Sequence, residues 1–143
     1  MSKNNKIGSV ILYDSFEGFN ESEGLHKKEN IFFYENINFV KKTIKYLKLE
    51  NTYVEKTFFP NNLKRKIKKI KICHLDVNTY KSTKKAFYWV EKKIIKGGVI
   101  IFDDYGIWGV DGIKKFINDI EPKFKKKFLF INNHAGQCIL IKK

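Results

Sequence analysis

Cysteine is scarce in this sequence: the 143 residues contain only Cys73 and Cys138. Both lie in apolar strand-like runs, which argues against a disulfide-based scaffold and favours free thiols that pack as small apolar side chains. A disulfide between neighbouring strands is the alternative. Long apolar runs are also missing, because the N-terminal run ends at Asp14, so we expect neither a signal peptide nor a membrane-spanning helix. Together these features predict a cytoplasmic protein.

Arginine is nearly absent, since Arg65 is the only arginine among 29 basic residues. The formal net charge of +14 would favour binding to nucleic acid through the release of counterions. Base contacts and bidentate phosphate contacts depend mainly on arginine, however, and the lysines here accompany abundant Asn and Ile, as in AT-rich coding sequences. We therefore expect no nucleic-acid partner and interpret the charge as a determinant of solubility and association.

Several motifs of common enzyme classes are missing as well. The sequence has no GxxxxGKS phosphate loop and no serine or cysteine in a nucleophile-elbow context. His26 and His134 have no second histidine or cysteine at the spacing of a zinc site. An aromatic content of 15% and a hydrophobic content of 43% nevertheless predict a folded chain, and its length predicts one domain over residues 1–143.

Apolar runs and periodic stretches alternate along the chain and predict an α/β domain. Strands are predicted at 7–13, 52–58, 70–77 and 99–102, and in two runs within 128–141 that form an antiparallel hairpin at the sheet edge. Helices are predicted from about 36 to 47, over 60–69, from a cap at Ser82 to an end at Gly97 and Gly98, and over 113–120, where Pro122 starts a further turn or breaks the helix. The apolar run before Asp103 favours a mostly parallel sheet covered on both faces.

Three of the predicted strands end in carboxylates: "ILYD" in Asp14, "CHLD" in Asp76, and "IFDD" in Asp103 and Asp104. Ligands bind at the carboxyl ends of parallel strands, so we expect these side chains at one edge. Clustered carboxylates repel each other unless a cation or a proton lies between them, and Mg²⁺ is the ion such oxygens suit. Turns and helix caps are the alternative use of aspartate. The adjacent pair can serve one ion only if the chain turns there, and His74 is more often a packed core residue than a functional one.

Three segments together resemble one family. "DSFEGF" at 14–19, "KICHLDVNTYKSTKKAF" at 71–87 and "GGVIIFDDYGIWGVDGIKKFINDI" at 97–120 are similar to the macrocin O-methyltransferase family. The similarity runs from about Val10 to Lys142. It implies a Rossmann-like methyltransferase sheet, mostly parallel with a C-terminal antiparallel hairpin, and S-adenosylmethionine as the methyl donor.

The resemblance also implies roles for single residues at the cofactor. Asp14 would accept hydrogen bonds from the ribose hydroxyls of the cofactor, and Ser15 and Phe16 would form the adjoining wall. The expected substrate is a hydroxyl of a sugar or glycoside. Tyr80 and Tyr105 would contact it, with Trp108 as a further aromatic residue at the same edge.

The acids of "HLD" and "DDY" have an implied role too. Asp76, Asp103 and Asp104 would hold Mg²⁺, and Asp76 would also act as the general base. A metal that binds a hydroxyl lowers the pKa of that hydroxyl and fixes its direction of attack.

Two departures from the family pattern affect this expectation. Asn78 stands where the family commonly has a second acid, which keeps an oxygen but loses a charge. The first strand and its glycine-rich turn have no counterpart, because thirteen residues precede Asp14 and Gly8 is the only glycine among them. The chain is then expected to be a part of a split enzyme, a remnant without catalysis, or a chain complemented by a partner chain or a homo-oligomer. The competing hypothesis is a non-catalytic scaffold or binding domain with basic faces.

Overall fold

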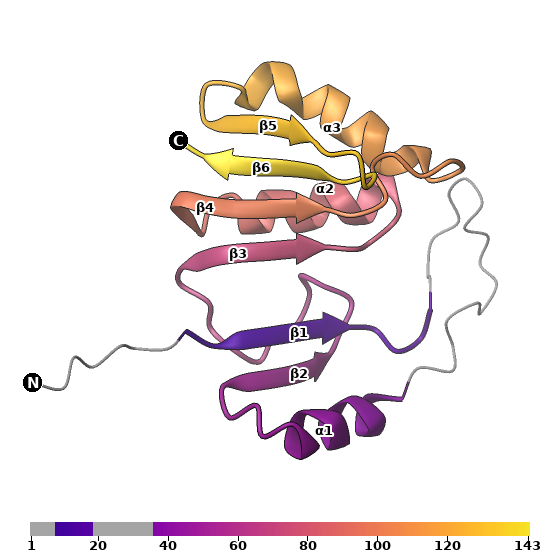
Figure 1. Cartoon of the computed structure of the whole chain (residues 1–143), viewed down its shortest axis with the longest axis vertical. Helices are drawn as coiled ribbons and strands as arrows, with labels where there is room; N and C mark the ends of the chain where they lie inside the picture. Colours follow the sequence, from indigo (N-terminus) through magenta and orange to yellow (C-terminus); the bar gives the residue numbers. More distant parts are fainter. Residues whose placement is uncertain (1–7, 19–35) are drawn as a thin grey trace, which may run out of the picture. The chain divides into compact units, whose positions relative to one another are not determined.

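The computed structural model describes residues 8–18 and 36–143, which divide into two compact units (Figure 1). The N-terminal unit comprises residues 8–18 and 36–64, and the C-terminal unit comprises residues 65–143. The single domain over residues 1–143 stays a prediction. No described helix is both long and apolar enough to cross a bilayer.

The N-terminal unit contains a two-stranded sheet and one helix. Strand β1 (Val10–Asp14) pairs in parallel with β2 (Thr52–Lys56), and α1 (Ile37–Tyr46) comes between them in the sequence. Asn36 begins α1, because its side-chain oxygen accepts a hydrogen bond of 2.8 Å from the backbone nitrogen of Asn38. The predictions of two strands and of a helix between them in the sequence are confirmed.

The short helix predicted over 60–69 is wrong. This segment consists of turns and irregular backbone up to the first strand of the C-terminal unit. Asn62 has a φ of 50°, in the left-handed region, which interrupts a right-handed helix. The segment offers only Leu63 and Ile67 as half-buried apolar side chains among exposed lysines, too few to hold a helix against a core.

The C-terminal unit is a four-stranded sheet in the order β3-β4-β6-β5. Its strands are β3 (Ile70–Leu75), β4 (Ile94–Phe102), β5 (Phe128–Asn132) and β6 (Cys138–Lys142). Strand β3 is parallel to β4, whereas β6 is antiparallel to both β4 and β5. Three strands therefore share one direction and β6 alone opposes them. This confirms the predicted fold class with its C-terminal antiparallel hairpin, whose β5 forms the sheet edge.

Two helices, α2 (Tyr80–Val90) and α3 (Asp111–Phe124), pack against each other and cover one face of this sheet (Figure 1). The core between helices and sheet is aromatic. Phe87 of α2 lies at its centre, with ring centroids 6.0 Å from Phe102, 5.5 Å from Phe116 and 6.2 Å from Phe128. All four rings are buried. Since Phe102 is the last residue of β4, this core fixes the end of the strand that leads into Asp103.

Three boundary predictions need correction. Helix α2 is capped by Thr79 and not by Ser82. The Thr79 hydroxyl accepts a hydrogen bond of 3.2 Å from the backbone nitrogen of Ser82, which lies in the first turn of the helix. Gly97 and Gly98 do not end a helix but lie inside β4, where the register against β3 shifts, and Gly97 has a φ of 72°. Pro122 lies inside α3 and does not end it.

The other face of the four-stranded sheet is apolar and is covered by neither α2 nor α3. Side chains alternate between faces along each strand, and the residues that point away from the helices are half-buried or exposed. Ile72, Leu129 and Ile131 are 67%, 48% and 40% exposed. Parallel strands usually have both faces covered, whereas α2 and α3 cover only one face in the described part of this unit. Cys73 and Cys138 lie in β3 and β6, and both are free thiols as expected.

Candidate functional site

Strands β3 and β4 end side by side in carboxylates. Leu75 and Phe102 are opposite each other in the parallel register, and the backbone nitrogen of Asp103 donates a hydrogen bond of 3.0 Å to the carbonyl of Leu75. Asp76, Asp103 and Asp104 therefore lie at one edge of the C-terminal sheet. Asp76 is exposed and the other two are partly buried. This is the edge at which ligands bind in open α/β sheets.

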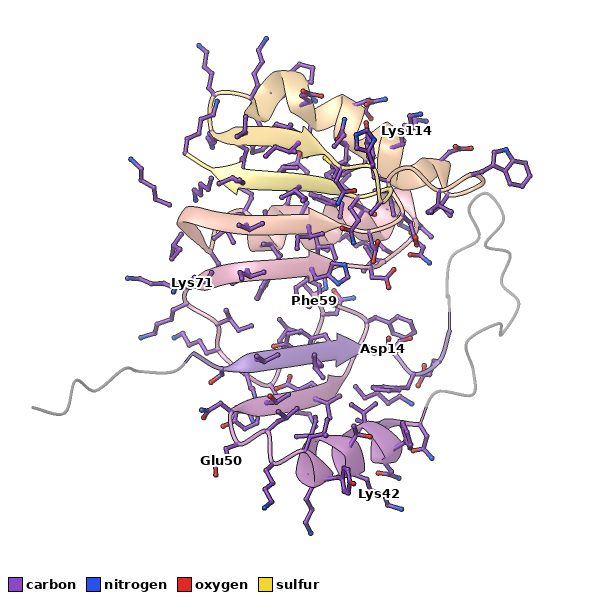
Figure 2. All side chains as sticks on the ribbon, viewed as in Figure 1. Asp14, Lys42, Glu50, Phe59, Lys71 and Lys114 are labelled. Carbon is purple, nitrogen blue, oxygen red and sulfur yellow. The ribbon has the colours of Figure 1, made fainter. Side chains whose placement is uncertain are left out.

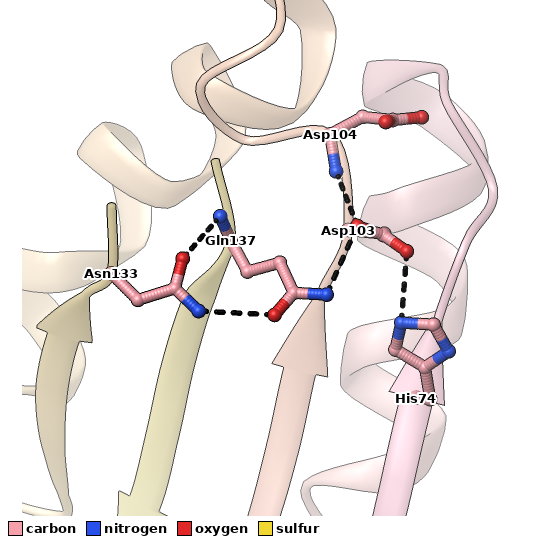
Figure 3. Close-up of polar contacts among 5 residues, drawn as sticks. All are labelled: His74, Asp103, Asp104, Asn133 and Gln137. Carbon is pink, nitrogen blue, oxygen red and sulfur yellow. Dashed lines mark hydrogen bonds and ion pairs between the residues drawn. The ribbon is translucent and has the colours of Figure 1, made fainter. Parts of the chain in front are cut away.

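Asp103 belongs to a network that runs across the strand ends (Figure 3). Its Oδ2 lies 3.0 Å from Nε2 of His74 on β3. Its Oδ1 accepts hydrogen bonds from Nε2 of Gln137 at 3.2 Å and from the backbone nitrogen of Asp104 at 3.1 Å. Asn133 holds Gln137 in turn, through bonds of 3.0 and 2.8 Å. Both oxygens of Asp103 are thus directed at nitrogen donors from neighbouring strands and loops.

Asp104 is turned away from that network. Its backbone has a φ of 56°, so the chain turns here as an ion shared by two adjacent acids would require. The side chain of Asp104 nevertheless lies apart from that of Asp103 and its partners (Figure 3). It meets Asp76 instead, through Asn78. We assign the nitrogen of the Asn78 amide to the side that faces the two carboxylates, because an oxygen there would meet only acceptors. In this orientation the amide donates to Oδ1 of Asp76 at 2.9 Å and to Oδ2 of Asp104 at 3.2 Å.

These directions decide whether the three acids fit a Mg²⁺ ion. Within the described ranges, no three Asp, Glu, His or Cys side chains gather as a metal site would require. The oxygens of Asp103 point to His74 and Gln137, and the position between Asp76 and Asp104 is taken by an amide. The ligand set that the resemblance implies, Asp76 with Asp103 and Asp104, therefore does not fit one ion in this structure.

Asp14 ends β1 in the N-terminal unit and is exposed (Figure 2). Its Oδ1 accepts a hydrogen bond of 2.6 Å from the backbone nitrogen of Phe16, which has a φ of 52° and is buried. The hydroxyl of Ser15 donates to the carbonyl of Gly18 at 3.1 Å and accepts from the backbone nitrogen of Glu17 at 3.2 Å. These bonds fix the turn, which presents one exposed carboxylate. A carboxylate can accept hydrogen bonds from the two hydroxyls of a ribose. That Asp14 shares an edge with the acids of the C-terminal unit stays a prediction.

The predicted substrate residues have partners within the protein. The Tyr80 hydroxyl donates to Oδ2 of Asp119 at 2.8 Å and so ties the start of α2 to α3. The Tyr105 hydroxyl accepts from Nδ2 of Asn132 at 3.3 Å, and burial is the main cause that raises the pKa of this phenol. Trp108 is 87% exposed in the loop after Asp104. Tyr105 and Trp108 thus follow the acidic edge in sequence, whereas Tyr80 braces two helices.

Gln137 and Asn133 were not anticipated as part of this edge. Both lie in the β5–β6 loop, where Gln137 reaches Asp103 because β6 is inserted next to β4, and Asn133 holds Gln137. Only that strand order brings residues so distant in sequence together. The signal in the sequence is the run "NNHAGQ", whose amides precede the buried strand that begins at Cys138.

The sequence has a family match over most of its length. The family described as Macrocin-O-methyltransferase (TylF) matches residues 1–127. The chain belongs to the macrocin O-methyltransferase family. No curated protein matches the sequence significantly.

Solved methyltransferase structures share the fold of this family member. The O-methyltransferase NovP superposes with a TM-score of 0.78 at 20% identity, over 94% of this chain and 60% of NovP. CalS11, a calicheamicin methyltransferase, gives 0.74 at 12% identity, over 96% of this chain and 62% of CalS11. A putative methyltransferase from Streptococcus mutans in complex with SAH gives 0.57 at 12% identity, over 95% and 90%. This chain therefore spans about three-fifths of NovP and CalS11.

Proposed function

We propose that this chain forms the part of an S-adenosylmethionine-dependent O-methyltransferase that contacts both the cofactor and the acceptor, and that the enzyme methylates a hydroxyl of a sugar or glycoside. The observation that carries the proposal is the edge where Asp76 and Asp104 converge beside Tyr105, in a chain of the macrocin O-methyltransferase family. The sugar is supported by CalS11, which is described as a TDP-rhamnose 3'-O-methyltransferase. The methyl donor is supported by the SAH bound to the Streptococcus mutans protein of the same fold.

In the proposed reaction, Asp76 takes the proton of the acceptor hydroxyl. When bound, S-adenosylmethionine supplies an electrophilic methyl group, whose bond to sulfur breaks as the new carbon–oxygen bond forms and leaves its electron pair on sulfur. Asp76 is exposed at a strand end, so an incoming hydroxyl can reach its carboxylate. Proton transfer to a positioned carboxylate contributes on the order of 10²- to 10⁴-fold to such rates. The remaining acceleration comes from holding the hydroxyl in line with the methyl group.

The turn after β1 is the proposed cofactor contact. Asp14 would accept hydrogen bonds from the ribose hydroxyls, while Ser15 and Phe16 hold the turn in shape. Ser15 acts through its bonds within the turn, and Phe16 through its buried ring. In the C-terminal unit, Tyr105 and Trp108 would contact the sugar, because both lie in the loop that follows Asp104.

Magnesium takes no part in this proposed reaction. The resemblance implies Mg²⁺ on Asp76, Asp103 and Asp104, but Asp103 is committed to His74 and Gln137.

We also propose that a further polypeptide segment supplies the first strand and the glycine-rich turn. In the described part of the chain, β3 pairs only with β4, so its outer edge is available to another strand. Ile72 on β3 is 67% exposed, and such edges and faces are usually covered in parallel sheets. About two-fifths of the length of NovP and of CalS11 lies outside the part that this chain matches, which is enough for such a segment. The two free thiols fit a reducing, cytoplasmic setting.

Calorimetric titration with SAH tests the proposed function directly. We expect the chain to bind SAH, and Asp14→Asn to weaken binding by about tenfold or more, because hydrogen bonds to a charged group contribute about 1.5–3 kcal/mol. Glu50→Gln is the matched control, since it removes one exposed carboxylate from the same unit. Equal affinities of the two variants, or no binding at millimolar SAH, would contradict the proposal. Retention on heparin that weakens with salt, without SAH binding, would instead support a non-catalytic scaffold with basic faces.

A further inference from the structure

We propose that Asn78 is a positioning residue whose side-chain amide holds Asp76 and Asp104 together and occupies the place of a divalent cation between them. The inference deepens the proposed function, and it rests on that function only for the role of Asp76 as the base. The geometry of the three side chains carries it.

The two carboxylates converge on one atom of the Asn78 amide, which we assign as the nitrogen because an oxygen there would face two acceptors and no donor. In that orientation Oδ1 of Asp76 lies 2.9 Å and Oδ2 of Asp104 lies 3.2 Å from the nitrogen. A primary amide has two N–H groups, so each carboxylate receives one of them. Hydrogen bonds to ionised acceptors are about twice as strong as neutral ones. The amide therefore offsets the repulsion that would otherwise drive two converging carboxylates apart.

The backbone of Asn78 is held in the conformation that this contact needs. Asn78 and Asp104 both have a φ of 56°, and asparagine and aspartate tolerate the left-handed region better than other residues with a side chain. Asn78 directly precedes Thr79, the cap of α2, which is buried and accepts a bond of 2.6 Å at its carbonyl from the Thr83 hydroxyl. The start of α2 thus anchors Asn78 firmly beside the end of β3.

Asp103 cannot act as a third carboxylate beside Asp76 and Asp104. Its oxygens face His74 and Gln137, so the ends of β3 and β4 hold two separate arrangements. In one, Asp103 is fixed by donors from neighbouring strands and loops. In the other, Asp76 and Asp104 are fixed by Asn78. A ligand set of two carboxylates and an amide oxygen would also suit Mg²⁺ if the Asn78 amide were turned over, so the test must separate these two orientations.

NMR of the ¹⁵N-labelled full chain separates them. We expect the Asn78 side-chain NH₂ signal, assigned by through-bond correlation in the ¹³C,¹⁵N-labelled wild-type chain, to exchange slowly with solvent and to be insensitive to millimolar Mg²⁺. Paramagnetic Mn²⁺ reports metal binding independently. In the wild-type chain it should not selectively broaden the signals of Asp76, Asn78 and Asp104. In Asn78→Asp, which places a third carboxylate at this point, it should broaden them with an affinity at least about tenfold higher.

Asn51→Asp is the control, because it adds the same charge at an exposed position of the N-terminal unit. It should leave Mn²⁺ binding at the Asp76 edge unchanged. Selective broadening of the wild-type signals by micromolar Mn²⁺ would overturn the inference, as would an Asn78 NH₂ that exchanges as fast as that of an exposed asparagine. Both readouts on the wild-type chain remain decisive if Asn78→Asp does not fold. Neither uses SAH, so failure here is distinguishable from failure of the proposed function.

Discussion

Replacement of Phe87 by alanine should destabilise the C-terminal unit severely. Phe87 is fully buried, and its ring contacts those of Phe102, Phe116, Phe124 and Phe128 at centroid distances of 5.1–6.2 Å. Buried Phe→Ala substitutions cost about 3–5 kcal/mol, and each aromatic pair contributes about 0.5–1.5 kcal/mol beyond its buried area. These four phenylalanine partners place the expected loss near the upper end, about 5 kcal/mol, against a typical total of about 5–15 kcal/mol.

The measurement is urea denaturation followed by far-ultraviolet circular dichroism, with Phe39→Ala as the control. Phe39 is 70% exposed on α1, so its replacement should change the free energy of unfolding by no more than about 0.5 kcal/mol. Because Phe102 leads directly into Asp103, Phe87→Ala should also broaden the amide signals of the acidic edge. A loss below about 2 kcal/mol for Phe87→Ala, or equal losses for both variants, would refute the packing argument.

Two further predictions follow from glycine packing and from cysteine burial. Gly98→Ala should lower the free energy of unfolding by about 1–3 kcal/mol, because the new Cβ would lie 2.8 Å from the carbonyl oxygen of Ile95. Gly8→Ala, with nothing within 4 Å of the new Cβ, should have almost no effect in the same denaturation experiment. Burial raises the pKa of Cys73 and of Cys138 from 9.0 to about 12. At pH 8 iodoacetamide should therefore alkylate both about a thousandfold more slowly in the folded than in the urea-unfolded chain, and equal rates would contradict this burial.

Alternating apolar runs and helical stripes were sufficient to predict the order of most elements. The stripe of Ile113, Phe116, Ile117 and Ile120 is the buried face of α3, because amphipathic periodicity follows directly from burial on one side. The boundaries failed where backbone conformation decides. Gly97 and Gly98 are predicted to end a helix, but they lie inside β4, where the register against β3 shifts.

The acidic edge was predictable in composition but not in arrangement. Parallel strands bring their carboxyl ends together, and this places Asp76 beside Asp103 and Asp104. Which acid meets which partner depends on left-handed backbone at Asn78 and Asp104, and on the insertion of β6 beside β4. Neither leaves a periodic signal in the sequence. The pairing of Asp103 with His74 and Gln137, and of Asp76 with Asp104 through Asn78, therefore emerged only from the structure.

The most direct test of the central claim is an NMR titration of the ¹⁵N-labelled chain with SAH. The proposal is that Asp14 accepts hydrogen bonds from the ribose of the cofactor and that Asp76 takes the proton of the acceptor hydroxyl. It predicts that backbone signals of 14–16 and of 76–78 and 103–105 shift together, with a single affinity. Shifts confined to one of the two units, or distributed over the lysine-rich surface without either segment, would contradict it.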